Sequence, residues 1–584
     1  MGKGGIAALI TSLALLAGAA PAPAEYYSLV STPSGIPGPG PAEENAKPAS
    51  SYPSISADGH FVTFASNRTD LVPGDSNGRT DVFVRNLSTN TTERVSLTSG
   101  GAQATGPAGM DQEMFFSPPA ISADGRYVAF VSNATNLVPG DSNGATDVFV
   151  RDRLAGTTER ASVSNAGTQG NGNSYRPVTI SGDGRYVAFQ TQATNLDPTP
   201  GASSYNVVLR DRVAMTTRAV GGGNASALPT LSANGSLIAF FSYAQLMPGD
   251  SFNTPDVFVR NLGSNAVQRV SQSSGGVIGN GPSLDNRISG NGSVVAFDSQ
   301  ASNLVAGDTN GVRDVFVKTL ASGVTERVSV ASDETQGNGP SPDSFDRAPA
   351  VSADGRYIGF LSQATNLYPG AENDINHLGL YIRDRTAGTT TLASVRGNRA
   401  AASSGFGISL SADGRYLAFS TFESFLPSDS GNAESDVYVA DLTQRPSGAS
   451  APTACPPGSS ETVFCGVLPP GRYASASAAG RVTELIGDFT KDRARGTNGR
   501  NRIRGAAGDD RLDGRGGADT ISGGKGNDFL IGGGGEDSFN GGPGKDNINA
   551  SGQRGERIVC GPGRDRVTGA KGDRVAKSCE NVSR

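Results

Sequence analysis

The chain has 584 residues but no tryptophan and only two histidines, His60 and His377. Two histidines at non-equivalent positions cannot build a His-x-x-His zinc site, and the sequence contains neither a Gly-x-Ser-x-Gly nucleophile motif nor a Gly-Lys-Ser/Thr phosphate loop. The absence of tryptophan removes the largest aromatic surface on which a sugar ring could stack. Paired carboxylates of the glycosidase kind are the catalytic arrangement that the 55 acidic residues still permit.

Long apolar runs are also missing, except at the N-terminus. Lys3 precedes an apolar run that ends near Ala20, and Ala22-Pro23-Ala24 has the small-x-small pattern of a cleavage site. The run is shorter than the roughly 20 residues that a membrane-spanning helix needs. The pattern predicts a secretory signal peptide over residues 1–24, cleaved after Ala24. We therefore expect a secreted protein, extracellular or at the cell surface, whose mature chain has no integral membrane segment.

A strong excess of one charge is absent too. The chain has 49 basic and 55 acidic residues and a formal net charge of −6, which gives no reason to expect nucleic acid or an anionic membrane as partner. Glycine is abundant, at 80 residues, and 33 prolines accompany it. This composition favours a loop-rich, β-rich protein.

Cysteine is scarce, and all four cysteines lie in the last quarter of the chain: Cys455, Cys465, Cys560 and Cys579. In an exported protein an even, local set is typical of disulfides. Pairing of nearest neighbours would join Cys455 to Cys465 and Cys560 to Cys579. The sequence alone does not fix this connectivity.

A repeat runs through most of the chain. The stretch "ISADGHFVTFASNRTDLVPGDSNGRTDVFVRNLSTNTTERVSL" from Ile55 is matched almost residue for residue by the stretch from Ile121. Within it, the turn tetrapeptide Ser-Ala-Asp-Gly or a close variant occurs seven times along the chain. These copies begin at residues 56, 122, 181, 232, 289, 352 and 411. Each copy contains four short segments of alternating apolar residues bounded by Asp-Gly or Asn-Gly turns. Seven copies of four antiparallel strands predict a seven-bladed β-propeller.

The last copy is incomplete, which indicates how the ring closes. It ends after "SDVYVADLTQRP" and lacks a "TERVSV" strand. The missing pattern occurs near the start of the chain, in "EYYSLVSTPSG" at residues 25–35. We expect residues 26–31 to supply the outer strand of the seventh blade. Residues 25–446 would then form the propeller.

The repeats resemble the TolB-type propeller repeat, which has a Ser-x-Asp-Gly turn, an Ala-Phe strand and an Asp-Val-Phe/Tyr-Val strand. The resemblance covers residues 25–446, and no counterpart of the TolB N-terminal domain precedes them. It implies the propeller fold. Because this repeat occurs in secreted and surface proteins of unrelated function, it implies no particular activity.

Three loops of the repeats share an acidic pattern: "GDSNGRTD" with Asp75 and Asp81, "GDSNGATD" with Asp141 and Asp147, and "GDTNGVRD" with Asp308 and Asp314. Oxygen ligands at alternating positions with a turn glycine suit a hard cation. Asp and Asn-Gly also form turns by bonding to their own backbone, and this interpretation is favoured because other copies lack the pattern. These loops are expected on the same face as long variable connections, where a partner site would lie.

The C-terminal part has a different repeat. Residues 447–484 are rich in Pro, Gly, Ala and Ser and are interpreted as a linker with a small disulfide loop. Within residues 485–584 six nonapeptides follow each other: "GTNGRNRIR" from 496, "GAAGDDRLD", "GRGGADTIS", "GGKGNDFLI", "GGGGEDSFN" and "GGPGKDNIN". Position four is always glycine, position eight is apolar, and position six is Asn501, Asp510, Asp519, Asp528, Asp537 and Asp546 in turn. This is the G-G-x-G-x-D-x-U-x pattern of a calcium-binding β-helix.

These nonapeptides resemble the haemolysin-type (RTX) calcium-binding repeat. The resemblance implies a parallel β-roll in which units two apart stack, with Asp510, Asp519, Asp528, Asp537 and Asp546 as metal ligands and Ca²⁺ as cofactor. The pairs that bridge an ion would be Asp510 with Asp528, Asp519 with Asp537, and Asp528 with Asp546. One aliphatic residue in nine cannot offset a backbone ordering cost of about 1–2 kcal/mol per residue. The roll is therefore expected to fold only when Ca²⁺ binds.

Two departures from the repeat mark the ends of the roll. Asn501 replaces aspartate in the first unit, among three arginines, which predicts a weak site or a cap. The period breaks at "ASGQRGERIV", and a degenerate unit with Asp565 follows before Cys579. The predicted disulfide is expected to end the roll there.

Together these patterns predict an all-β chain, a seven-bladed β-propeller plus a C-terminal parallel β-roll. The function they favour is a secreted calcium-binding protein with a non-enzymatic binding or surface-interaction role, whose partners would be calcium ions and an extracellular protein or glycan. The alternative is a secreted hydrolase or lyase with its site on the variable loop face. Facing carboxylates with an arginine in the central cavity would favour the enzyme.

Overall fold

The computed structural model describes most of the repeat region and the C-terminal part. The described residues are 26–33, 50–109, 118–197, 206–221, 226–250, 254–341, 348–368, 378–396, 399–400, 407–421, 435–444, 473–475, 483–486, 493–495, 500–507, 509–551, 555–569 and 572–583. The predicted signal peptide, His377, Cys455 and Cys465 lie outside them. No helix in the described ranges is long and apolar enough to cross a membrane.

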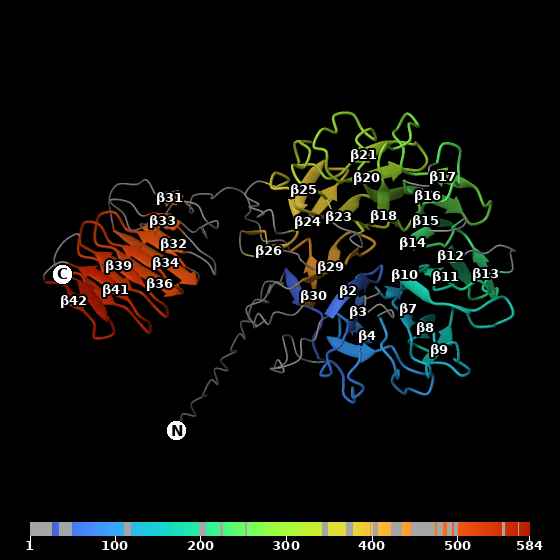
Figure 1. Cartoon of the computed structure of the whole chain (residues 1–584), viewed down its shortest axis with the longest axis horizontal. Helices are drawn as coiled ribbons and strands as arrows, with labels where there is room; N and C mark the ends of the chain where they lie inside the picture. The colour runs from blue at the N-terminus through green and yellow to red at the C-terminus, as the bar shows by residue number, and fades with distance from the viewer. Residues whose placement is uncertain are drawn as a thin grey trace, which may run out of the picture.

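Seven four-stranded antiparallel sheets form the propeller, arranged around a common centre (Figure 1). Blades one to three consist of β2 (Ser50–Ile55), β3 (Phe61–Ser66), β4 (Asp81–Asn86) and β5 (Thr91–Arg94); β6 (Ala120–Ile121), β7 (Tyr127–Ser132), β8 (Asp147–Asp152) and β9 (Thr157–Arg160); and β10 (Ser174–Ile180), β11 (Tyr186–Thr191), β12 (Asn206–Asp211) and β13 (Thr216–Ala219). Blades four and five consist of β14 (Ser226–Leu231), β15 (Leu237–Ser242), β16 (Asp256–Asn261) and β17 (Val267–Arg269); and β18 (Ser283–Ile288), β19 (Val294–Ser299), β20 (Asp314–Thr319) and β21 (Thr325–Arg327). Blades six and seven consist of β22 (Ala350–Val351), β23 (Tyr357–Ser362), β24 (Gly379–Asp384) and β25 (Thr389–Leu392); and β28 (Ile408–Leu410), β29 (Tyr416–Thr421), β30 (Asp436–Asp441) and β1 (Tyr27–Leu29). A short hairpin of β26 (Val395–Arg396) and β27 (Arg399–Ala400) lies between the last two blades in the chain.

The strand from the N-terminus closes the ring, as the sequence predicts. Strand β1 pairs antiparallel with β30, with Tyr27 opposite Ala440 and Leu29 opposite Tyr438. It is the outermost strand of the seventh sheet, whose order is β1-β30-β29-β28. The N-terminal segment that precedes blade one therefore completes blade seven through backbone hydrogen bonds.

The Ser-x-Asp-Gly tetrapeptide forms the turn between the first two strands of a blade. In blade one the Ser56 hydroxyl donates to Asp58 Oδ1 at 2.5 Å, and the Ser56 Oγ accepts the Phe61 amide at 3.0 Å. Gly59 has a φ of 75°, which a residue with a side chain adopts only at a cost. The recurring tetrapeptide is thus explained by this turn.

The turns also join the blades into a closed ring of backbone hydrogen bonds. The amide of the second turn residue, or in blade five the third, donates to a carbonyl of the turn in a neighbouring blade. The donor and acceptor pairs are Ala57 to Ala123, Ala123 to Gly182, Gly182 to Ala233, Ala233 to Gly290, Asn291 to Ala353, Ala353 to Ala412 and Ala412 to Ala57, at 2.7–3.1 Å.

The propeller core lies between adjacent sheets. Valine and phenylalanine side chains of one blade pack against those of the next, as Val82 and Val84 of β4 do against Val128 and Phe130 of β7. One such cluster joins Val30, which follows β1, to residues of blades one and seven. The alternation of apolar residues in each repeat supplies these side chains.

The C-terminal part forms two parallel sheets whose strands alternate along the chain. One sheet contains β31 (Tyr473–Ser475), β33 (Arg493–Arg495), β35 (Arg511–Asp513), β37 (Phe529–Ile531), β39 (Asn547–Ala550), β41 (Arg566–Gly569) and β43 (Asn581–Ser583). The other contains β32 (Thr483–Ile486), β34 (Asn501–Ala507), β36 (Thr520–Lys525), β38 (Ser538–Asn540), β40 (Arg557–Val559) and β42 (Arg574–Val575). The sheets begin within the segment interpreted as a linker, because β31 and β32 pair with β33 and β34.

The position-eight side chains form the core of this β-roll. Ile503, Leu512, Ile521, Leu530, Phe539 and Ile548 are all buried in one cluster, which continues with Ile558 and Val567. The predicted disulfide between Cys560 and Cys579 is present. The roll does not end at this disulfide, because β43 follows Cys579 and pairs with β41.

Candidate metal centre

The predicted aspartates stack in rows between successive coils of the roll. The backbone N–H of Asp510 donates to Asp528 Oδ1 at 2.8 Å, that of Asp519 donates to Asp537 at 2.8 Å, and that of Asp528 donates to Asp546 at 2.9 Å. All five side chains are buried. The structure thus brings together each of the three pairs that the resemblance implies.

The second carboxylate oxygen of four of these aspartates has no donor in the described part of the chain. Oδ2 of Asp519, Asp528, Asp537 and Asp546 is buried and accepts no hydrogen bond from any described residue. A buried acceptor without a partner costs free energy, and a buried charge costs more. A cation at each of these oxygens would remove that cost.

A position beside the first glycine of two units, Gly514 and Gly523, suits such a cation. A Cβ atom added to Gly523 would contact Asp528 Oδ2 and would lie 2.6 Å from the carbonyl oxygen of Gly541 in the next coil. At Gly514 the corresponding neighbours are Asp519 Oδ2 and the Gly532 carbonyl oxygen, the latter at 2.8 Å. Carboxylate and carbonyl oxygens together are the ligand type that Ca²⁺ prefers. The residues present therefore fit a calcium ion.

Glycine at position four is required by the backbone. Gly526 and Gly544 have φ angles of 132° and 152°, outside the range that residues with a side chain readily adopt. A Cβ on Gly544 would also overlap the Gly526 carbonyl oxygen. The glycine content of the roll therefore reflects both the turn conformation and the close approach of stacked coils.

Burial controls the protonation of the carboxylates. Burial raises the pKa of Asp519 and of Asp546 to about 7, and it also raises the pKa of Asp528 and Asp537. Hydrogen bonds from Asn501 partly oppose the effect at Asp519. Without a cation Asp519 and Asp546 are therefore about half protonated near pH 7, and a metal ion must displace those protons.

Asn501 occupies position six of the first nonapeptide, where the later units have aspartate. Its side-chain amide donates to the Gly514 carbonyl at 3.1 Å and to Asp519 Oδ1 at 2.8 Å. The amide therefore supplies donors between a carbonyl and a carboxylate, where the aspartates of later coils supply none. This geometry supports the interpretation of Asn501 as a cap.

Replacing Asn501 by aspartate is expected to create an additional calcium site. The change removes two donors and places a second carboxylate beside Asp519, so isothermal titration should show one more Ca²⁺ bound per chain. Asn527→Asp is the matched control, because Asn527 lies on the surface of the roll and donates to the exposed Asp509. An unchanged stoichiometry in Asn501→Asp would show that the amide does not stand in for a cation.

The rows continue past the predicted residues. The amide of Asp546 donates to Asp565 Oδ1 at 2.9 Å, and Asp565 Oδ2 likewise has no donor among the described residues. Glu556 is also buried, directly before β40. One extra residue after Asn549 shifts the nonapeptide register, which hides Glu556 from a strict search. The signal available in the sequence was the Arg-Ile-Val strand that follows it.

The acidic loops of the propeller are neutralised by arginine. Arg94 on β5 approaches Asp75 at 3.0 Å and Asp81 at 3.3 Å, and Asn77 donates to Asp81 at 3.1 Å. The copies with Asp141 and with Asp308 have the same arrangement, formed with Arg160 and Arg327. The arginine supplies the positive charge within the repeat itself. The turn interpretation is therefore the better supported one.

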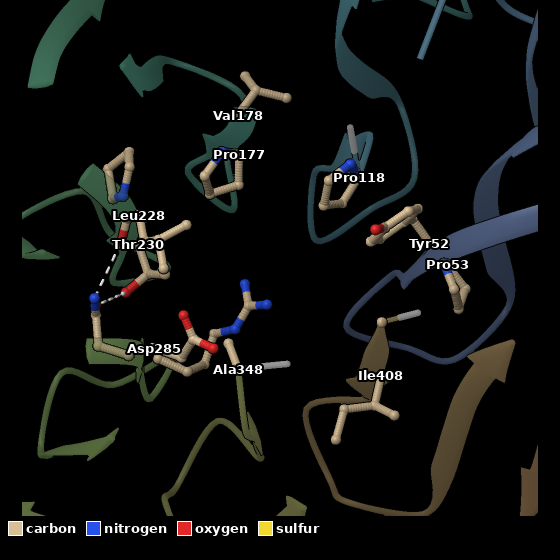
Figure 2. Close-up of a pocket in the computed structure, with 14 residues that line it drawn as sticks. Tyr52, Pro53, Pro118, Pro177, Val178, Leu228, Thr230, Asp285, Ala348 and Ile408 are labelled. Atoms are coloured by element: carbon tan, nitrogen blue, oxygen red, sulfur yellow. Dashed lines mark hydrogen bonds between the residues drawn. The ribbon is translucent and has the colours of Figure 1, made fainter. Parts of the chain in front are cut away.

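A cavity of about 70 Å³ lies at the centre of the propeller, lined by the innermost segments of all seven blades. Figure 2 shows Tyr52, Pro177, Leu228 and Ile408 around it, with Asp285 on one wall. The polar lining comes mainly from Asp285, Asn286 and Arg287 of blade five, and Asn286 is bonded to blade four through the Leu228 carbonyl at 3.1 Å. The described lining is thus largely apolar, with one carboxylate and one arginine.

No group of three or more His, Cys, Asp or Glu side chains in the described part of the chain is arranged to hold a metal ion. The roll instead places a carboxylate oxygen near a backbone carbonyl oxygen, as at Gly514 and Gly523.

Solved structures share a general likeness with the propeller. TolB from Acinetobacter baumannii is 13% identical over 63% of this chain and 66% of its own, just under two thirds, with a TM-score of 0.33. An oligogalacturonate lyase from Vibrio parahaemolyticus is 14% identical over 68% and 92%, with a TM-score of 0.41. The β-propeller domain of the Trilobed protease from Pyrococcus furiosus is 11% identical over 68% and 96%, with a TM-score of 0.39. These scores support no inference about activity.

The chain matches none of the curated proteins with which it was compared. A family model matches the roll, where residues 486–521 and 513–548 fit the description "RTX calcium-binding nonapeptide repeat". Repeats of this kind bind Ca²⁺ as a structural ligand and are typical of secreted proteins. The chain therefore carries RTX calcium-binding repeats, which form a β-roll attached to a seven-bladed propeller.

Proposed function

We propose that this is an exported calcium-binding protein in which Ca²⁺ folds the C-terminal roll and the propeller has a non-enzymatic binding role. The observation that carries the proposal is the row of buried Oδ2 atoms that have no donor in the described residues. Oδ2 of Asp519 and of Asp528 lies beside a position that a glycine carbonyl oxygen of the next coil also approaches. Export follows from the predicted signal peptide, and extracellular calcium would then load the roll after secretion.

Calcium removal is expected to unfold the roll while the propeller stays folded. The apolar core of the roll has one residue per nonapeptide, which is too little to offset chain entropy without bound metal. Hydrogen–deuterium exchange of the full chain at pH 8, followed by mass spectrometry, should show rapid exchange over residues 500–583 with chelator and protection with Ca²⁺. Peptides from β3 and β4 should be unaffected and provide the internal control.

The same experiment has a clear opposing outcome. If residues 500–583 are equally protected with chelator and with Ca²⁺, the roll folds without metal and the proposal fails. Mg²⁺ at the same concentration should protect much less, because it prefers a small octahedral site and gives up its waters reluctantly. Equal protection by Mg²⁺ would argue against a calcium-specific site.

A binding role for the propeller is supported by the central cavity. Facing carboxylates with an arginine in the cavity would instead support the alternative prediction, a hydrolase or lyase. The described lining has Asp285 and Arg287 on the same strand and apolar side chains on the opposite walls. This arrangement favours a ligand-binding surface over a carboxylate pair.

A further inference from the structure

Charges in the roll are sorted between its inside and its outside. Residues 500–584 contain 15 lysines and arginines against 12 aspartates and glutamates. Eight of the acidic side chains are buried, and those that are not are Asp509, Asp513, Glu536 and Glu580. Every lysine and arginine between residues 500 and 583 whose exposure the structure describes is exposed. The surface of the roll is therefore strongly basic, although the whole chain has a net charge of −6.

These cations are not neutralised by the roll itself. Among the described residues, no lysine or arginine of the roll forms an ion pair with a carboxylate, whereas arginines of the propeller form many. Arg511 lies over the ring of Phe529, 4.4 Å from its centre, which leaves its charge uncompensated. Because most acidic side chains of the roll are buried, few carboxylates lie at its surface to offset these cations.

Some of these cations form a column across the sheet of even-numbered strands, from β34 through β36, β38 and β40 to β42. Strand register places Arg502 beside Thr520, Thr520 beside Ser538, Ser538 beside Arg557, and Arg557 beside Arg574. All three arginines of this basic column are exposed. With about 4.8 Å between neighbouring strands, the column extends roughly 19 Å. It presents guanidinium groups with hydroxyl groups between them.

We propose that the calcium-loaded roll binds an anionic polysaccharide, with carboxylate or sulfate groups, along this basic column. Arginine forms bidentate hydrogen bonds with carboxylate and with similar oxyanions. Thr520 and Ser538 would bond sugar hydroxyls between the charged groups. The inference rests on the proposed function, because the column exists only in the folded roll.

Two other polyanions fit the surface less well. A lipid surface would need apolar side chains to insert, and Val582 is the only large hydrophobic side chain of the described roll that is substantially exposed, at 38%. Single-stranded nucleic acid would need free aromatic faces for its bases, whereas Phe529 lies beneath Arg511. A hydrophilic chain with repeated negative charges needs neither feature.

The test is binding of the full chain to immobilised dextran sulfate and hyaluronate, with uncharged dextran as the reference surface. In saturating Ca²⁺ at physiological ionic strength we expect binding to both anionic polymers that weakens steeply with added salt. The triple variant Arg502→Gln, Arg557→Gln, Arg574→Gln should weaken binding about tenfold. The control variant Lys525→Gln, Lys545→Gln, Arg566→Gln removes the same charge elsewhere on the roll and should change it far less.

Hydrogen exchange of each variant with Ca²⁺ separates this inference from the proposed function. If the roll is protected by calcium but does not bind the polymers, the polysaccharide inference fails and the calcium proposal stands. Equal loss in the two triple variants would reduce the effect to net charge and overturn the column as a site. Equal or tighter binding to duplex DNA or to phosphatidylglycerol vesicles would overturn the choice of polysaccharide. Binding to only one of the two anionic polymers would identify sulfate or carboxylate as the recognised group.

Discussion

Removal of residues 26–33 is expected to lower the melting temperature of the propeller by at least about 10 °C. This segment, which includes β1, buries Tyr26, Tyr27, Leu29 and Val30 against blades six, seven and one. Each such side chain contributes about 1.5–3 kcal/mol when it leaves water. The sum is comparable with the whole stability of a typical domain, about 5–15 kcal/mol.

Polar contacts at this strand also cross the closure. The hydroxyls of Tyr26 and Tyr27 both donate to the Ala393 carbonyl, at 3.1 and 2.6 Å. The Thr32 carbonyl accepts from Thr92 of blade one at 2.8 Å. Loss of the segment would therefore remove two donors from the buried Ala393 carbonyl and the acceptor of the Thr92 hydroxyl, in addition to exposing the edge of β30.

A milder pair of variants tests the same prediction without deleting backbone. Leu29→Ala should lower the free energy of unfolding by about 2–5 kcal/mol, as is usual for a buried leucine. Leu154→Ala is the matched control, because Leu154 is 81% exposed. Calorimetry of the full chain in saturating Ca²⁺ measures both. Equal melting temperatures for the two variants would show that β1 does not hold the ring closed.

A low pH is expected to increase the stability of the calcium-free roll. Burial raises the pKa of Asp519 and Asp546 to about 7, whereas an aspartate in an unfolded chain titrates near 3.9. Between roughly pH 4 and pH 7 the folded roll then binds more protons than the unfolded chain. Its stability without metal is fully present below the unfolded pKa and is lost as the pH rises through about 7. Above that pH the ionised carboxylates oppose folding.

Calcium should reverse the sign of this pH dependence. Binding requires ionised carboxylates, so protons compete with the metal and the calcium concentration at half saturation should rise as the pH falls from 8 to 6. Hydrogen exchange over residues 500–583, corrected for the intrinsic exchange rate, should show protection with chelator at pH 5 and none at pH 8. The same measurement with Ca²⁺ should show protection at pH 8.

The double variant Asp519→Asn, Asp546→Asn is the control for the titrating groups. An amide resembles the neutral carboxyl, so the calcium-free roll of this variant should be protected at pH 8 and should depend weakly on pH. Its calcium affinity should be reduced. A calcium-free wild-type roll that is less protected at pH 5 than at pH 8 would contradict the assignment of these two aspartates.

The fold was predictable from the sequence because its signals are local and repeated. Seven Ser-x-Asp-Gly turns gave the number of blades, and the missing last strand with its counterpart at residues 26–31 gave the closure, which β1 confirms. The six nonapeptides gave the roll and the burial of position eight. Repetition made each of these patterns independent of any single residue.

Other features depend on neighbours that are distant in sequence. The pairing of Arg94 with Asp75 and Asp81 joins the fourth strand of a blade to a loop before its third strand, which spacing alone does not reveal. The basic surface of the roll was hidden because buried and exposed charges cancel in a count of residues. Glu556 was missed because one inserted residue changes the register. Ligand roles for the aspartates stay predictions that the titrations above would test.

The ring of hydrogen bonds between the turns has a consequence for how such a protein can evolve. Ala or Gly occupies the second turn position of every blade, and a Cβ added to Gly182 would lie 3.0 Å from the Ala233 carbonyl. A closed ring of seven such hydrogen bonds fixes the distance between the turns of neighbouring blades. Duplication of one repeat would break that ring and require a wider one, so the turns themselves oppose a change in the number of blades.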